Sequence, residues 1–345
     1  MSQPIAAVAT PLRATERRSK FDLRSIQRLI VGVSMLAAYA RRLFSPGLLV
    51  VLVLAAGGCS REHSDQAVAP QRLFVTAPAD HSIAVYENGA SGRAAPLEVI
   101  KEPATDRPVA VGVDLAGEAF VANANGNVRV FIHRPGGKYE LLKSFEGPNT
   151  RIAHPTALAV NPAGSFYLAD AADGHGRVEW FSGGASGDIY VDRVIEGPRS
   201  GIKTPSGLAI DGAQRAFVTD RSTNRLLVFA ADASGDAAPL AVIGGLQAPG
   251  QVAVDDLLNV YVAEAADNSI AVFGNTGPES WSRAATITSD ALKNPTGLAI
   301  DLSGRIAVGA AGGILFFPNA AHGKVDPALS LTGPTPMQPA GICIH

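Results

Sequence analysis

The chain has 345 residues, 47% of them hydrophobic and 17% charged, with 36 glycines and 23 prolines, a composition that favours a turn-rich β protein with a sizeable core. Residues 1–58 carry eight Lys or Arg against two acids, a net charge of +6, which leaves −8 for residues 59–345. An acidic domain repels phosphate backbones, so nucleic acid is excluded as a partner.

Residues 1–58 are predicted to be a signal peptide region. Arg41 and Arg42 precede an apolar run over residues 43–56, which ends in small residues before Cys59. A charged n-region, a short apolar h-region and small residues before the cut are typical of an exported precursor. The run is shorter than the about 20 residues that a membrane span needs. Met35 is an alternative start, because a signal peptide of ordinary length would begin there.

Cys59 is the predicted lipidation site. The segment Leu-Ala-Ala-Gly-Gly-Cys that ends at Cys59 resembles the lipobox of bacterial lipoproteins, whose cysteine carries a diacylglyceryl group. Ala56 departs from that pattern, because the family usually has Leu three residues before the cysteine. The alternative is an ordinary secretory signal with an incidental cysteine. The resemblance implies a chain anchored by lipid alone at a bacterial cell envelope, in the outer membrane and periplasm or at the cell surface, with residues 59–71 as a tether.

A repeat of roughly 45 residues fills residues 72–345. Each copy opens with Pro, a small residue, an apolar alternation and then Asp or Asn, most clearly in residues 155–161, 205–211 and 295–301. The repeat prolines are 47, 50, 44, 46 and 44 residues apart: Pro108, Pro155, Pro205, Pro249, Pro295 and Pro339. A period this steady indicates repeated supersecondary units.

Each unit is predicted to hold four short antiparallel strands. A turn with Asp or Asn first and Gly fourth joins the first two strands, as at residues 114–117 and 301–304. The third strand ends in aromatic residues, and a Gly-rich turn leads to the fourth. Residues 73–100 supply three strands of one unit, and residues 339–344 supply its missing first strand. The sequence therefore predicts an all-β, six-bladed propeller, monomeric, whose C-terminal strand closes the ring with the N-terminal blade.

The repeat resembles the NHL repeat and related six-bladed propeller repeats of bacterial lipoproteins and exported proteins. Related gluconolactonase-like and paraoxonase-like propellers hold a catalytic calcium, often through Asn or Asp just after the position of the repeat proline. The residues at that position here are Val109, Thr156, Ser206, Gly250, Thr296 and Ala340. None is a carboxylate or an amide, which argues against this enzyme class.

Four polar residues at the ends of second strands form the remaining candidate ligand site: Asn123, Asp170, Asp220 and Glu264. An arc of these groups near one mouth of the channel could bind a cation or a cationic ligand. The alternative is that each accepts hydrogen bonds from its own inter-strand turn, as Asp and Asn do locally. The histidines fall in unrelated phases of the repeat, so no metal site is predicted.

The sequence thus predicts a non-catalytic binding or scaffold module at the cell envelope, without a cofactor, that presents its loops to a protein, peptide or glycan. The alternative is a divergent metal-dependent hydrolase, lactonase- or esterase-like, or a lyase, that uses the central channel. Calcium is the cofactor that this alternative would require.

Overall fold

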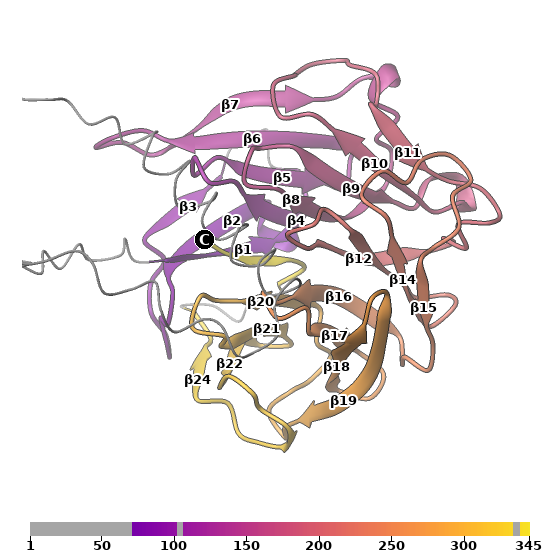
Figure 1. Cartoon of the computed structure of the whole chain (residues 1–345). Coiled ribbons are helices and arrows are strands. Elements are labelled where there is room, and N and C mark those ends of the chain that lie inside the picture. Colours follow the sequence, from indigo (N-terminus) through magenta and orange to yellow (C-terminus); the bar gives the residue numbers. More distant parts are fainter. Residues whose placement is uncertain (1–70, 102–105, 334–338) are drawn as a thin grey trace, which may run out of the picture. The chain divides into compact units, whose positions relative to one another are not determined.

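The computed structural model describes residues 71–101, 106–333 and 339–345, which form six small antiparallel sheets, the blades of a ring (Figure 1). This confirms the predicted all-β, six-bladed propeller. The described residues all belong to one compact unit, residues 67–345. The predicted signal region 1–58, Cys59 and the tether up to residue 70 lie outside the described residues.

Blades 1 to 3 follow one another along the first half of the chain. Blade 1 has the order β25 (Ile342–Ile344), β1 (Arg72–Ala77), β2 (Ser82–Glu87) and β3 (Glu98–Ile100). Blade 2 has β4 (Pro108–Val113), β5 (Ala119–Asn123), β6 (Asn127–His133) and β7 (Tyr139–Phe145). Blade 3 has β8 (Pro155–Val160), β9 (Phe166–Asp170), β10 (Arg177–Phe181) and β11 (Arg193–Ile195).

Blades 4 to 6 repeat the same order, from the innermost strand outward. Blade 4 has β12 (Pro205–Ile210), β13 (Ala216–Asp220), β14 (Arg225–Phe229) and β15 (Ala241–Ile243). Blade 5 has β16 (Pro249–Val254), β17 (Val260–Glu264), β18 (Ser269–Gly277) and β19 (Ser280–Thr288), with β23 (Gly323–Lys324) added at its outer edge. Blade 6 has β20 (Gly297–Ile300), β21 (Ile306–Ala310), β22 (Gly313–Phe317) and β24 (Leu329–Leu331).

The C-terminal strand closes the ring, as the repeat predicted. In Figure 1 the end of the chain, marked C, lies beside β1, and β25 pairs with β1 so that Ile344 faces Leu73 and Ile342 faces Val75. The Thr296 hydroxyl of blade 6 also donates a hydrogen bond of 2.7 Å to the Pro339 carbonyl. Because Ile342 is 94% buried between blades 6 and 1, closure joins backbone pairing to apolar packing.

The turn between the first and second strands is built by its leading Asp or Asn. In blade 6 the Asp301 carboxylate accepts backbone hydrogen bonds from Ser303 and Arg305, both 2.9 Å long. The fourth turn position takes a left-handed conformation, with glycine at Gly304 (φ 80°), whereas Leu258 (φ 65°) adopts it without glycine in blade 5. The turn is therefore set by the Asp side chain and the backbone more than by glycine alone.

The core lies between neighbouring blades as separate apolar clusters. Four phenylalanines pack together between blades 2 and 3: Phe120, Phe145, Phe166 and Phe181. The helical segments among the described residues are single 3-10 turns, η1 (Pro78–Asp80), η2 (Pro148–Thr150) and η3 (Ala172–Gly174). No helix in this part of the chain has the length and apolarity needed to cross a membrane.

Candidate functional site

The four predicted ligand residues occupy one equivalent position of four blades, the last residue of the second strand. Each lies opposite the repeat proline of the neighbouring first strand, as Asp170 lies opposite Pro155 and Asp220 opposite Pro205. All four are buried, with 0% to 1% of their surface exposed: Asn123, Asp170, Asp220 and Glu264. A buried carboxylate must be paired or hydrogen-bonded, so the partners of these groups decide what they can do.

The carboxylates of Asp170 and Asp220 hold the loop that enters their own blade. Asp170 accepts backbone hydrogen bonds from Ala153 at 2.7 Å and from Ala172 at 2.8 Å. Asp220 accepts bonds from the backbone of Lys203 at 2.6 Å and from the Ser222 hydroxyl at 2.9 Å, among others. Each carboxylate thus ties the incoming loop to the turn between its second and third strands.

Burial raises the pKa of Asp220, but the backbone hydrogen bonds from Lys203 and Thr204 and the bond from Ser222 outweigh it and hold that pKa below its usual value. Asp220 is therefore a charged, hydrogen-bonded anchor of its blade at neutral pH.

Glu264 and Asn123 also bond within their own blades. Glu264 accepts from the Gln247 backbone at 3.1 Å and pairs with Arg283, whose two guanidinium nitrogens lie 3.0 and 3.2 Å from its two oxygens. The Asn123 amide donates to the Asn127 side chain at 2.9 Å. The predicted bonds from the inter-strand turn are present at Asp170 and Asp220, whereas Glu264 bonds to the incoming loop, to β18 and to Arg283. Ligand binding at the four residues stays a prediction.

No described contact joins one of these four side chains to another. Within residues 71–101, 106–333 and 339–345, no group of three or more His, Cys, Asp or Glu side chains is arranged to hold a metal ion.

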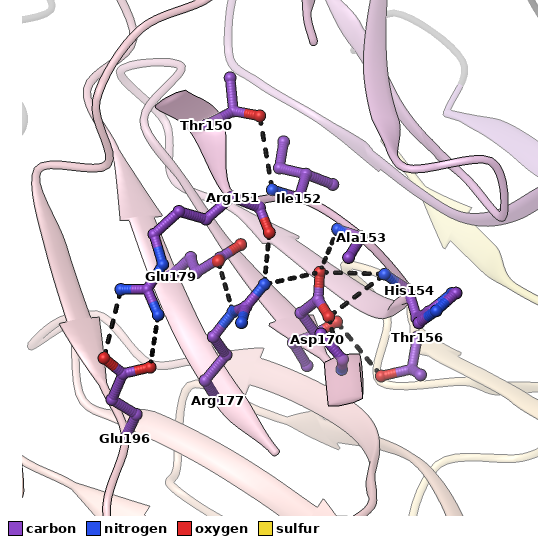
Figure 2. Close-up of polar contacts among 12 residues, drawn as sticks. Thr150, Arg151, Ile152, Ala153, His154, Thr156, Asp170, Arg177, Glu179 and Glu196 are labelled. Carbon is purple, nitrogen blue, oxygen red and sulfur yellow. Dashed lines mark hydrogen bonds and ion pairs between the residues drawn. The ribbon is translucent and has the colours of Figure 1, made fainter. Parts of the chain in front are cut away.

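Asp170 is part of a larger polar network (Figure 2). The repeat pattern in the sequence did not predict this network. Arg177 is its centre: it donates to Glu179 at 2.6 Å, reaches the Arg151 carbonyl, and lies 3.7 Å from the Asp170 carboxylate. The Arg151 guanidinium in turn binds both oxygens of Glu196, at 3.2 and 2.7 Å. The network therefore links the loop that enters blade 3 to β9, to β10 and to the residue that follows β11.

Glu179 is the least satisfied member of this network. It is fully buried, and among the described residues its Oε2 has no hydrogen-bond partner. Burial raises the pKa of Glu179 to about 7, Arg177 opposes that rise, and the nearby Asp170 charge adds to it. The group therefore changes its protonation near neutral pH.

Blade 3 is the only blade with a carboxylate at the position of Glu179. The strand register places Ala84, Arg129, Leu227, Ala271 and Leu315 at the same position of the other blades. The sequence signal was a single acid inside the apolar strand Val-Glu-Trp-Phe, and an alignment of third strands would have found it. Since Glu179 is closed off from solvent, its chemistry is that of an internal titrating group rather than of a group that meets substrate.

The residues after the repeat prolines lie at irregularities of the first strand. The pairing register shifts around Val109, Thr156, Ser206 and Gly250, the arrangement of a β-bulge. The Ser206 hydroxyl donates to the Pro249 carbonyl of the next blade at 2.6 Å. Thr296 makes the equivalent bond to Pro339, so hydroxyls at this position fasten one blade to the next.

No protein-family model matches the chain, and no curated protein matches it. Among solved structures, a protein of unknown function from Bacteroides caccae is 14% identical, with a TM-score of 0.60, over 80% of this chain and 99% of that one. A functionally unknown protein from Desulfotomaculum acetoxidans is 13% identical, with a TM-score of 0.57, over 79% and 98%. A candidate 6-phosphogluconolactonase from Bacteroides uniformis is 14% identical, with a TM-score of 0.55, over 76% and 83%. At these identities the likeness supports the propeller fold alone.

Proposed function

We propose that the chain is a non-catalytic binding or scaffold module, exported and anchored by lipid on Cys59 to the bacterial cell envelope, where it presents a rigid propeller to a protein, peptide or glycan. The observation that carries the proposal is that the carboxylates at the ends of the second strands already bind parts of the fold. Asp170, Asp220 and Glu264 are buried and hydrogen-bonded to their own loops, so they stabilise blades instead of offering open ligand positions.

The first-strand bulges support the same function. The Ser206 hydroxyl at one bulge and the Thr296 hydroxyl at the equivalent position of blade 6 donate to carbonyls of neighbouring blades. A calcium site needs six to eight oxygen ligands, several of them carboxylate or carbonyl oxygens directed at one point. The hydroxyl oxygens of Ser206 and Thr296 instead link one blade to the next, which favours binding through outer surfaces over chemistry at the axis.

The alternative function is a divergent metal-dependent hydrolase or a lyase that uses calcium in the channel. Its support is that proteins of similar fold from Bacteroides uniformis and Bacteroides fragilis are named as candidate 6-phosphogluconolactonases, at 14% and 11% identity. For such an activity here, Asp170 or Asp220 would have to exchange backbone hydrogen bonds for a metal ion, at the expense of blade stability.

Native mass spectrometry with metal analysis separates the two functions. We expect the purified full chain to retain no divalent ion, with or without added calcium, and to show an unchanged melting temperature. One tightly retained ion per chain that is lost in Asp170→Asn and Asp220→Asn, together with lactone or ester hydrolysis that needs it, would replace the binding function with the enzymatic one.

The anchor has its own experiment. Expressed in a bacterial host, the chain should incorporate labelled palmitate and enter the detergent phase, and Cys59→Ser should abolish both. A Cys59→Ser chain that still carries label would exclude Cys59 as the lipidation site, and an unlabelled, secreted wild-type chain would support the alternative of an ordinary signal peptide.

A further inference from the structure

The outer edges of four blades are covered by the chain itself. In the connection between the third and fourth strands of blade 4, Gly235 crosses to blade 3 and pairs in parallel with Ile195 of β11. The Gly235 N–H donates to the Val194 carbonyl at 2.6 Å, and the Glu196 N–H donates to the Gly235 carbonyl at 3.0 Å. The crossing segment therefore satisfies the backbone groups that an outermost strand turns toward solvent.

The same crossing recurs at three other junctions. Gly187 pairs with Phe145 of β7 in blade 2, and Gly92 pairs with Leu331 of β24 in blade 6. In blade 6 the equivalent segment is β23, which pairs in parallel with β19 of blade 5. The crossing sequences are Ala-Ser-Gly-Arg, Ala-Ser-Gly-Asp, Ala-Ser-Gly-Asp and Ala-His-Gly-Lys, at residues 90–93, 185–188, 233–236 and 321–324.

Each crossing segment turns on a glycine in the left-handed conformation. The φ angles are 60°, 85°, 60° and 67° at Gly92, Gly187, Gly235 and Gly323. A Cβ at any of these four glycines would meet no atom within 4 Å, so the backbone angle and not a lack of space requires glycine. The segment that covers a blade edge thus has a defined chemistry: an alanine two residues before one left-handed glycine, and a charged residue directly after it.

Blades 2 and 5 have no crossing segment among their described residues. Their third and fourth strands are joined by tight hairpins, closed between His133 and Tyr139 in blade 2 and between Gly277 and Ser280 in blade 5. The edges that they would have covered are β3 of blade 1 and β15 of blade 4. These two strands close two similar segments, Pro-Leu-Glu-Val-Ile at residues 96–100 and Pro-Leu-Ala-Val-Ile at residues 239–243.

The backbone groups at these two edges are left without the bonds that the other edges make. In blade 3 the backbone groups of Val194 and Glu196 point outward from the sheet. The strand register gives the same outward positions to the backbone of Val99 and Lys101 in blade 1 and of Val242 and Gly244 in blade 4. Within the described residues, none of these four makes a backbone bond of the kind that Gly235 provides. An open row of donors and acceptors is a template for another strand.

The open edges carry exposed apolar side chains, beside which the exposed Lys101 lies in blade 1. Val99 is 47% exposed and Val242 is 52% exposed, whereas the equivalent Ser144, Val194, Thr286 and Ser330 on covered edges are all partly buried. Leu97 and Leu240 flank them, with 63% and 37% of their surface exposed. Each open edge therefore combines unused hydrogen-bonding groups with apolar surface next to them.

We propose that β3 and β15 are two docking edges for an extended segment of a partner protein. This segment has an alanine two residues before one left-handed glycine and a charged residue after it, and it lies parallel to the edge strand. The chemistry of this partner is read from the four segments of the chain that already cover equivalent edges. Docking by an added strand rests on the proposed binding function and names the surface and the partner for it. It does not depend on the lipid anchor. Blades 1 and 4 are three blades apart in a six-bladed ring, so the two edges lie on opposite sides of it.

The experiment uses a fluorescein-labelled peptide with the sequence of residues 230–239 and the full chain in detergent, with binding followed by fluorescence anisotropy. We expect saturable binding of two peptides per chain. Val99→Lys and Val242→Lys should each remove one site, because each puts a charge in place of the exposed apolar side chain on which an added strand would pack. The double variant should bind at least tenfold more weakly. A peptide with alanine in place of the glycine should bind about fivefold more weakly, since the left-handed angle costs about 1 kcal/mol more for alanine.

Leu302→Lys is the matched control, because Leu302 is 79% exposed and lies in a turn away from both edges. It should leave peptide binding unchanged, and thermal melting checks that all variants are folded. Absence of saturable binding up to millimolar peptide, or binding that survives in the double variant, would overturn the docking edges. If the chain also retains no metal and hydrolyses no lactone or ester, failure of peptide binding would leave the proposed binding function in place on another surface.

Light scattering tests the remaining occupant, a second copy of the chain. We expect a monomer. A dimer that Val99→Lys or Val242→Lys converts to monomer would mean that the edges pair with each other, and would overturn docking of a partner segment.

Discussion

The inner and outer rims of the propeller handle their polar groups in opposite ways. At the inner rim, strand ends such as Asp170 and Asp220 bury carboxylates completely and give each oxygen backbone donors. At the outer rim, β3 and β15 leave outward backbone groups and exposed valines beside one another. The polar residues that attract attention in the sequence are therefore the ones already used by the fold, whereas the groups free to bind a partner belong to ordinary apolar strands.

The difference has a physical origin. Asp170 and Asp220 end second strands in the packed interior of their blades, so these carboxylates are desolvated and must be satisfied from within. At the outer rim the blades diverge, and an edge is satisfied only where a neighbouring connection is long enough to cross to it.

Removal of residues 339–345 should have the largest effect on the inner rim. It deletes β25, leaves the edge of β1 open and removes the buried Ile342, so we expect a loss of at least about 4 kcal/mol in the free energy of unfolding. Urea denaturation measures it, with Ile342→Ala as a smaller change of about 2 to 4 kcal/mol. A truncated chain as stable as the full one would mean that the ring does not depend on its C-terminal strand.

Asp220→Ala should be next. The substitution leaves the backbone N–H groups of Lys203 and Thr204 without their acceptor, at a cost of about 3 kcal/mol by urea denaturation at pH 7. The exposed Asp256→Ala is the control and should change stability by less than about 0.5 kcal/mol. Since the folded-state pKa of Asp220 is depressed, its contribution should be present above pH 4 and be lost as pH falls through the folded pKa.

Glu179 is an exception among the buried carboxylates, because one of its oxygens has no hydrogen-bond partner among the described residues. Its folded-state pKa is raised from 4.5 to about 7, so the unfolded chain releases this proton first as pH rises. The Glu179 contribution to stability should therefore fall between about pH 4.5 and pH 7, by roughly 3 kcal/mol, and stay constant above that range. Glu179→Leu, which copies Leu227 of blade 4, and Glu179→Gln should both remove this part of the pH dependence.

Chemical denaturation of both variants and the wild type at pH 5, 6, 7 and 8 measures this change. Equal pH dependence in the wild type and in both variants would show that Glu179 titrates at its ordinary pKa.

The smallest effect on stability is expected at the outer rim. Val99→Lys and Val242→Lys change exposed side chains, so each should alter the free energy of unfolding by no more than about 0.5 kcal/mol while it blocks an edge. Urea denaturation beside the peptide titration separates the two effects. A loss above about 2 kcal/mol would mean that the valines pack in the fold and are not free surface.

Much of the candidate site could be located but not interpreted from the sequence. The repeat placed Asn123, Asp170, Asp220 and Glu264 at one equivalent position, and the structure has them there. Their partners come from loops some 17 residues away, such as Lys203 for Asp220, and no local pattern marks those backbone donors. An alignment of third strands would have marked Glu179 as a single acid in an apolar strand, but its partner Arg177 and its unsatisfied Oε2 follow only from the fold.

The sequence by itself determined the number of blades, the order of strands within them and the closure by the last strand, because period, alternation and turn residues are local and repeat along the chain. Only the tertiary structure decided which edges are covered. The segment of residues 233–236 closely matches that of residues 90–93, yet each covers the outermost strand of whichever blade precedes its own. The edges of β3 and β15 stay open because the blade that follows each has a hairpin in place of a crossing segment. Pairing between blades is a contact between distant segments, so it follows from the assembled ring and not from the residues of the strand itself.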